Sequence, residues 1–148
     1  MGETDILDHV RGDYLPGEEV SRVTELDVRA IIEQVQAQGT PILVVTYPAD
    51  GGWFWEANVG IRAAAAAHSV PVIESPQVLQ RLKVELLERG ERAPKALFFD
   101  RSAHPQQRLY DAIADAILET ADNRGLLNET GSLQRSAPNE KPSLSPAS

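Results

Sequence analysis

The sequence predicts an α/β fold in which a parallel sheet carries helices on both faces. Two observations support this prediction. Short apolar, β-branched runs bounded by prolines alternate with longer stretches of helical periodicity, and the alternation repeats along the chain. Strands that alternate with helices are joined by right-handed crossovers, which makes neighbouring strands parallel. The 148 residues suffice for one domain with a hydrophobic core.

The predicted elements begin after a leader, residues 1–19, which is rich in Gly, Pro and acids and is expected to form a loop. Apolar residues spaced by three and four predict helices over about residues 23–35, 53–68, 76–90 and 105–118. Short apolar runs predict two buried strands and one extended segment, at residues 41–48, 70–74 and 96–99. Residues 1–121 are expected to form a partial domain, and residues 122–148 a disordered tail.

The composition excludes several classes of function. The formal net charge of −8 opposes non-specific binding to nucleic acid or to anionic membranes. No apolar run is long enough to span a bilayer, and the polar, acidic first residues do not form a signal peptide. The absence of cysteine excludes thiolate metal sites and a cysteine nucleophile. The default expectation is a cytoplasmic protein, with export as the alternative if the true N-terminus lies upstream of Met1.

The residues best placed for chemistry are Asp100 and His104, in a loop between the segment 96–99 and the helix that starts at Pro105. Asp100 can accept a hydrogen bond from one ring nitrogen of His104, which leaves the other nitrogen to act as a general base. The alternative is a loop pair at a helix start without a catalytic role. No third or fourth ligand is evident nearby, so neither a metal site nor a cofactor is predicted.

Trp53, Phe54 and Trp55 follow a Gly-Gly loop at the sheet edge where parallel α/β sheets bind ligands. Aromatic side chains at that edge can line a substrate cleft, cover the sheet or fill a protein interface. No serine of the ordered region stands in a Gly-x-Ser-x-Gly or Gly-Asp-Ser turn after an apolar strand. Ser75 follows a strand but precedes Pro76, so its expected role is to cap the next helix.

Residues 98–105, Phe-Phe-Asp-Arg-Ser-Ala-His-Pro, and the helix after them resemble the C-terminal block of the SGNH (GDSL-type) ester hydrolases. That block is an Asp-x-x-His, usually followed by proline, whereas here the acid lies four residues before the histidine. Residues 40–48 are similar to the family strand that ends in a Thr-Tyr-Pro triplet, and Asn58 stands near a helix start where the family often has asparagine. Residues 2–5, Gly-Glu-Thr-Asp, are similar to the Gly-x-Asn-Asp block, with Thr4 replacing asparagine.

The resemblance implies a three-layer α/β/α sandwich with a flavodoxin-like parallel sheet, truncated at its N-terminus. It implies an ester hydrolase or deacetylase without a cofactor, acting on a small-molecule ester or an acetylated glycan. His104 would be the general base, and Asp100 would orient it. The expected oxyanion and substrate residues are Thr4, Asn58, Tyr47, Trp53 and Trp55. The family's Gly-Asp-Ser nucleophile turn has no counterpart here, so the implied enzyme is an impaired form without its serine.

The alternative interpretation is a non-catalytic α/β interaction domain or a gene fragment. Such a chain would leave a sheet edge uncovered, and an uncovered apolar edge favours self-association, so a homo-oligomer is expected. A third interpretation is a flavodoxin-like domain that binds a nucleotide or flavin. It is disfavoured because residues 47–52 lack a Gly-rich phosphate loop.

Overall fold

The computed structural model describes residues 17–49, 51–101 and 104–127. In this part of the chain the elements follow in the order α2 (Gly17–Ala37), β1 (Val44–Val45), α3 (Trp53–Ala67), β2 (Val72–Ile73), α4 (Ser75–Glu88) and α5 (Gln107–Asn123). A short 3-10 turn, Lys95–Leu97, lies between α4 and α5. None of the helices described is both long and apolar enough to cross a membrane.

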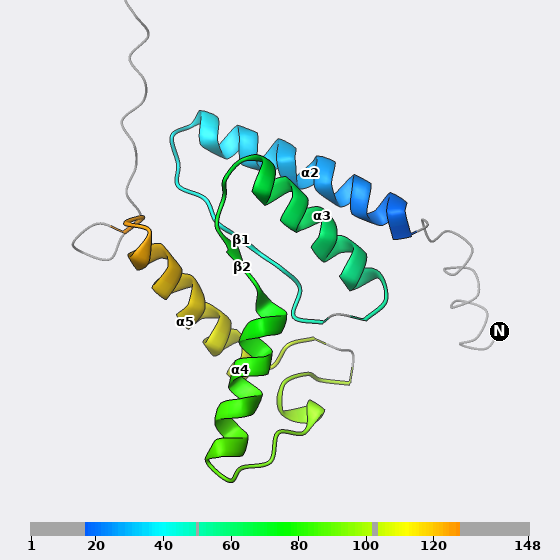
Figure 1. Ribbon diagram of the computed structural model, residues 1–148, viewed down its shortest axis with the longest axis vertical. Coiled ribbons are helices and arrows are strands. Elements are labelled where there is room, and N and C mark those ends of the chain that lie inside the picture. Colours follow the sequence, from blue (N-terminus) through cyan, green and yellow to red (C-terminus); the bar gives the residue numbers. More distant parts are fainter. Residues whose placement is uncertain (1–16, 50, 102–103, 128–148) are drawn as a thin grey trace, which may run out of the picture.

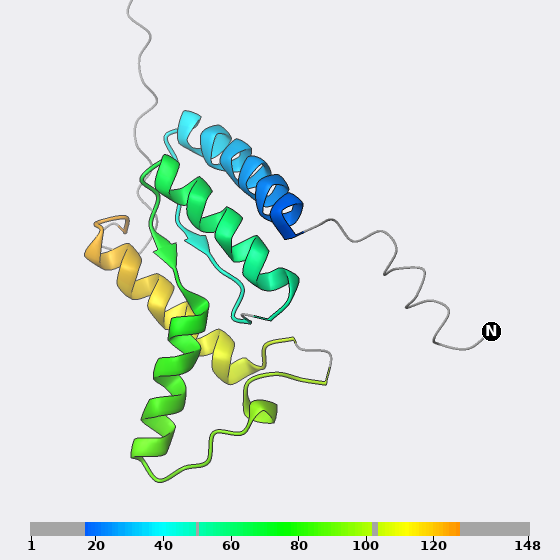
Figure 2. The same cartoon turned by 45° about the vertical axis from the view of Figure 1, so that its right-hand side comes forward.

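The two strands pair in parallel, with Val44 opposite Val72 and Val45 opposite Ile73. They lie between α3 and α5, and α2 runs along the outer side of α3 (Figure 1). Figure 2 shows the same arrangement after a turn, with α4 leading away from the end of β2 and packing against α5. Both strands end at one edge, from which the chain enters the loop before α3 and helix α4.

Two clusters of buried apolar side chains hold the helices to the strands. The first joins α4 and α5 to Phe98 and Phe99, and Ile73 of β2 belongs to it. The second joins Ile32 of α2 to α3, and Val44 and Val72 pack against it. Burial of one large apolar side chain contributes about 1.5–3 kcal/mol, so the short strands are held mainly by packing on their two faces.

The helices α2 and α3 approach closely at Gly60. A Cβ atom at this position would collide with the carbonyl oxygen of Ser21 and would lie 2.9 Å from the main-chain nitrogen of Glu25. Backbone atoms cannot move aside as a flexible side chain can. Glycine at position 60 is therefore what lets the two helices touch.

The prediction of a three-layer α/β/α sandwich with a flavodoxin-like sheet is wrong. The described residues are mostly helical, and their sheet contains two strands of two residues each. Prolines at positions 41, 48 and 71 bound the expected strands and have no N–H to donate to a ladder. The side chain of Asn58 binds the main-chain N–H and carbonyl of Tyr47, which alternation directs away from β2, so these groups are not offered to a further strand.

The expected extended segment at residues 96–99 is not a third strand. Its first two residues belong to the 3-10 turn, and Phe99 forms a single antiparallel bridge with Pro105. An apolar run becomes a strand only where a neighbour offers main-chain groups to pair with, and the described residues place no such neighbour beside this segment.

The four predicted helices are confirmed, with shifted ends. Helix α2 begins at Gly17, inside the residues expected to form a loop, and α5 begins at Gln107, two residues after Pro105. Helix α5 continues to Asn123, past the domain boundary expected at residue 121. Of the expected tail, residues 128–148 lie outside the described residues.

Candidate functional site

Asp100 and His104 face each other across a loop that hydrogen bonds close. The N–H of His104 donates to Asp100 Oδ1 at 2.9 Å, and the N–H of Asp100 donates to the His104 carbonyl oxygen, also at 2.9 Å. Nδ1 of the His104 ring lies 3.3 Å from Asp100 Oδ2. The carboxylate therefore contacts both the main chain and the ring of the histidine, which is the arrangement that the spacing predicts.

The hydrophobic core anchors both ends of this loop. Phe98 and Phe99, which precede it, are buried, and so is Leu109 in the first turn of α5. The N–H of Gln106 donates to the Phe98 carbonyl oxygen at 2.8 Å, which ties the exit of the loop to its entrance. The loop is thus fixed at its base, while the His104 side chain remains 75% exposed.

His104 lies on the wall of a cavity of about 370 Å³, which we call the histidine hollow. The hollow is formed by the end of β1 and its following loop together with the starts of α3, α4 and α5. Its lining includes Thr46, Tyr47, Phe54, Ser75, His104 and Tyr110. Sites for small molecules usually measure about 300–1,000 Å³, so the histidine hollow is large enough for a small ligand.

One wall of the histidine hollow is aromatic. The Tyr47 ring lies 5.6 Å from Trp53, edge to face, and 5.3 Å from Phe54, while Trp53 and Phe54 stack at 4.1 Å between ring centres. Tyr47 and Phe54 line the hollow, but neither Trp53 nor Trp55 does. Of the aromatic residues expected at this edge, the structure brings Tyr47 and Phe54 to the hollow, with Trp53 packed against both.

Asn58 acts on the loop after β1. It is fully buried, its Oδ1 accepts from the Tyr47 N–H at 2.7 Å, and its Nδ2 donates to the Tyr47 carbonyl oxygen at 3.0 Å. The amide therefore holds Tyr47 in position and does not line the hollow. Thr4, the other expected oxyanion residue, lies outside the described residues.

Ser75 is a residue of the histidine hollow that the sequence reasoning missed. Its Oγ is buried and has no hydrogen-bond partner among the described residues. The expected capping role is wrong, because Glu74 is the N-cap residue and its carbonyl oxygen accepts from the N–H groups of Gln77 and Val78. Its position between a strand and a helix does predict a place at the ligand-binding edge, and Pro76 after it suggests only a capping role.

Polar contacts fix the first turn of α4 behind the hollow. Thr46 Oγ1 accepts from the Ser75 N–H at 3.0 Å and donates to the Ile73 carbonyl oxygen at 3.2 Å. The Glu74 carboxylate pairs with Arg62 through two guanidinium nitrogens, at 2.8 Å each. These contacts hold the buried Ser75 in place on the wall of the hollow.

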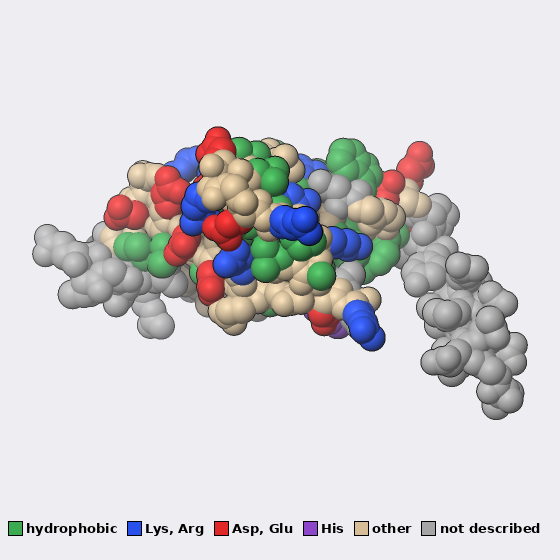
Figure 3. Space-filling view, turned by 90° about the horizontal axis from the view of Figure 1, so that it is seen from below, with side chains coloured by type: hydrophobic (Ala, Val, Ile, Leu, Met, Phe, Trp, Pro, Cys, Tyr) green, Lys and Arg blue, Asp and Glu red, His purple; other side chains and the backbone are tan. Residues whose placement is uncertain are grey.

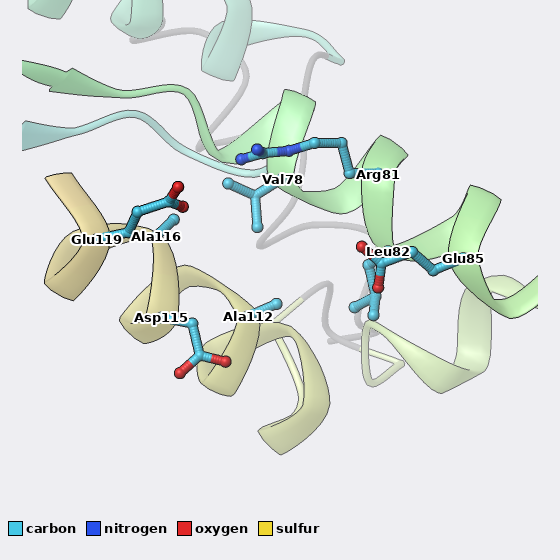
Figure 4. Close-up of a pocket in the computed structure, with 8 residues that line it drawn as sticks. All are labelled: Val78, Arg81, Leu82, Glu85, Ala112, Asp115, Ala116 and Glu119. Atoms are coloured by element: carbon cyan, nitrogen blue, oxygen red, sulfur yellow. The ribbon is translucent and has the colours of Figure 1, made fainter.

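A separate groove between α4 and α5 measures about 180 Å³, which is small for a ligand site. Figure 4 shows Val78 of α4 and Ala116 of α5 on its two sides, with the Arg81 side chain extending from α4 toward Glu119 of α5. Across the part of the chain that the structure describes, no group of three or more His, Asp or Glu residues is placed to hold a metal ion.

Comparisons with protein-family models, with curated proteins and with solved structures give no match for the chain. Its function is therefore inferred from the histidine hollow, which offers a ring nitrogen oriented by a carboxylate, a buried hydroxyl and an aromatic wall.

Proposed function

We propose that the chain is an ester hydrolase of low activity in which His104 is the general base and Asp100 orients its ring. The observation that carries the proposal is the double contact of the Asp100 carboxylate with His104, beside a hollow that suits a small ester. A hydrogen bond from Nδ1–H to Asp100 Oδ2 selects the tautomer whose Nε2 carries a lone pair. The His104 side chain is 75% exposed and lines the hollow, so a substrate there can approach Nε2.

In the proposed reaction Nε2 takes a proton from a water molecule while the water oxygen bonds to the ester carbonyl carbon. The tetrahedral intermediate then breaks its bond to the alcohol oxygen, which takes the proton from the imidazolium. The products are a carboxylic acid and an alcohol, and His104 returns to its neutral form. Water is the nucleophile in this scheme because Ser75 Oγ is too buried to reach a carbonyl carbon.

Two features support low rather than high activity. The side chains of His104 and Asp100 are 75% and 48% exposed, and electrostatic stabilisation of a transition state is weaker where water is not excluded. The Asn58 amide is engaged with Tyr47 and does not line the hollow as an oxyanion donor. The substrate class that we propose is a small carboxylic ester, with an acetylated glycan as the alternative implied by the resemblance of residues 98–105.

The proposal is tested by hydrolysis of p-nitrophenyl butyrate. His104→Ala should lower the protein-dependent rate by about 10²-fold, the lower end of what a general base contributes. Because any accessible imidazole hydrolyses such activated esters slowly, His68→Ala is the matched control. His68 lies after α3, with Nε2 3.4 Å from Glu33, and does not line the hollow. Equal losses in both variants, or no loss in His104→Ala, would overturn the proposal.

A second candidate function, self-association, is favoured by the outer edge of β1. Val44 and Thr46 donate their N–H groups to the carbonyl oxygens of Pro71 and Ile73, at 3.0 Å each. Alternation along the strand directs the main-chain groups of Val45 to the opposite edge, where no described strand pairs with them. An unpaired edge is a template for a strand of another chain, so copies of this chain are proposed to associate there.

A further inference from the structure

A second cavity, which we call the lysine hollow, adjoins the histidine hollow. It measures about 410 Å³ and is lined by Pro48, Ala49, Pro76, Leu79, Lys83 and Lys95, among others. Pro48 and Ala49 also line the histidine hollow, so the two cavities share part of a wall. The lysine hollow is therefore large enough for a small molecule and lies next to His104.

Among the residues that the structure describes, the charged side chains of the lysine hollow are all positive. Lys83 and Lys95 line it, and no described Asp or Glu does. The sequence contains three lysines, so two of the three meet at one cavity of a chain whose net charge is −8. Neither of the two forms an ion pair with any residue that the structure describes. An anionic ligand in the hollow would supply both lysines with a group of opposite charge.

Apolar side chains form the rest of the lysine hollow. Pro76 and Leu79 come from the first turns of α4, and Phe99 precedes the Asp100 loop. The Lys83 ammonium lies 5.8 Å from the centre of the buried Phe98 ring, so its stem runs along apolar surface. On the face seen from below, basic side chains lie among hydrophobic ones in the middle and right, and most acidic ones lie at the left (Figure 3). Basic and hydrophobic side chains therefore lie close together on this face of the molecule.

We propose that the lysine hollow binds an amphipathic carboxylate, of the kind that a medium-chain fatty acid anion represents. The carboxylate would lie at the two ammonium groups, and the alkyl chain would cover Pro76 and Leu79. Ammonium–carboxylate contacts are stronger than neutral hydrogen bonds, and the alkyl chain gains by leaving water. A role of the lysine hollow in substrate recognition rests on the proposed function. The hydrolase would then prefer esters that carry an anionic group in addition to the ester bond.

The binding is tested on the full chain with decanoate, by following backbone amide shifts in a titration. Saturable shifts are expected around residues 79–83 and 95–99. Acetate, which has the anion without the chain, and decyltrimethylammonium, which has the chain with the opposite charge, should give no comparable shifts at the same concentration. Equal binding of the cationic amphiphile would overturn the proposal, because the affinity would then not depend on the sign of the ligand's charge.

Variants isolate the contribution of the two charges. Lys83→Gln combined with Lys95→Gln should weaken decanoate binding by about tenfold, and the corresponding Lys→Arg pair should retain it. Arg81→Gln is the control, because it removes one charge from the same helix at the α4–α5 groove and should leave the affinity unchanged. An equal loss in Arg81→Gln, or full binding in the double Gln variant, would contradict the proposal. A chain that binds decanoate but hydrolyses no ester would refute only the proposed function.

Discussion

Two buried hydroxyl groups beside the histidine hollow differ in their partners. Thr46 Oγ1 accepts from the Ser75 N–H at 3.0 Å and donates to the Ile73 carbonyl oxygen at 3.2 Å. Ser75 Oγ is equally buried but has no partner among the described residues. A satisfied buried hydrogen bond contributes about 0.5–1.5 kcal/mol, whereas a buried polar group without one is destabilising. The two hydroxyls should therefore respond differently to removal.

Thr46→Val should lower the free energy of unfolding by about 1–3 kcal/mol, because it leaves the buried Ser75 N–H without an acceptor. Ser75→Ala should leave this free energy unchanged or raise it slightly, because it removes a hydroxyl that has no partner. Urea denaturation measures both. Thr46→Ser, which keeps the hydroxyl, is the control for the first variant. A loss in Ser75→Ala as large as that in Thr46→Val would contradict the assignment of partners.

Among the helices, the contact between α2 and α3 depends on Gly60, because glycine has no side chain to keep them apart. Gly60→Ala should lower the free energy of unfolding by about 1–3 kcal/mol, because the added methyl group meets the main chain of α2 at Ser21 and Glu25. Gly51→Ala is the matched control, since a Cβ atom there meets nothing within 4 Å. Thermal or urea denaturation of both variants checks the difference. Equal stability of the two would show that α2 and α3 do not touch at Gly60.

The helices could be predicted from the sequence, and the extent of the sheet could not. Helical spacing is a local signal, so the prediction of residues 53–68 agrees closely with α3 (Trp53–Ala67). Strand formation depends on a distant partner. The apolar run at 41–48 pairs over two residues only, because its partner strand β2 is itself only two residues long. Nothing in the run itself reveals how short its partner is.

The same distinction applies to the sites. The contact of Asp100 with His104 spans four residues and follows from their spacing in one loop. The lysine hollow brings Lys83 of α4 and Lys95 of the 3-10 turn beside Pro48, which precedes α3. Because residues from three segments meet there, the sequence alone indicates neither the hollow nor its charge.

At the scale of the whole molecule, the outer edge of β1 decides whether copies of the chain associate. Val45→Lys should make the protein sediment as a smaller species than the parent at the same concentration, because a lysine on an edge strand blocks pairing. Val59→Lys on α3 is a matched control, since Val59 is 37% exposed and Val45 is 36% exposed. Analytical ultracentrifugation measures the masses. A parent that is monomeric at every concentration, or an equal effect of both variants, would refute association through β1.

A double-mutant cycle shows whether Asp100 acts on ester hydrolysis through His104. Asp100→Asn keeps an oxygen that can accept from the His104 N–H, so the loop can still close while the charge beside the ring is lost. This substitution is expected to lower hydrolysis of p-nitrophenyl butyrate by about tenfold in the parent and to have no further effect in the His104→Ala variant. The same loss in both backgrounds would contradict the proposed role, because Asp100 would then act independently of His104.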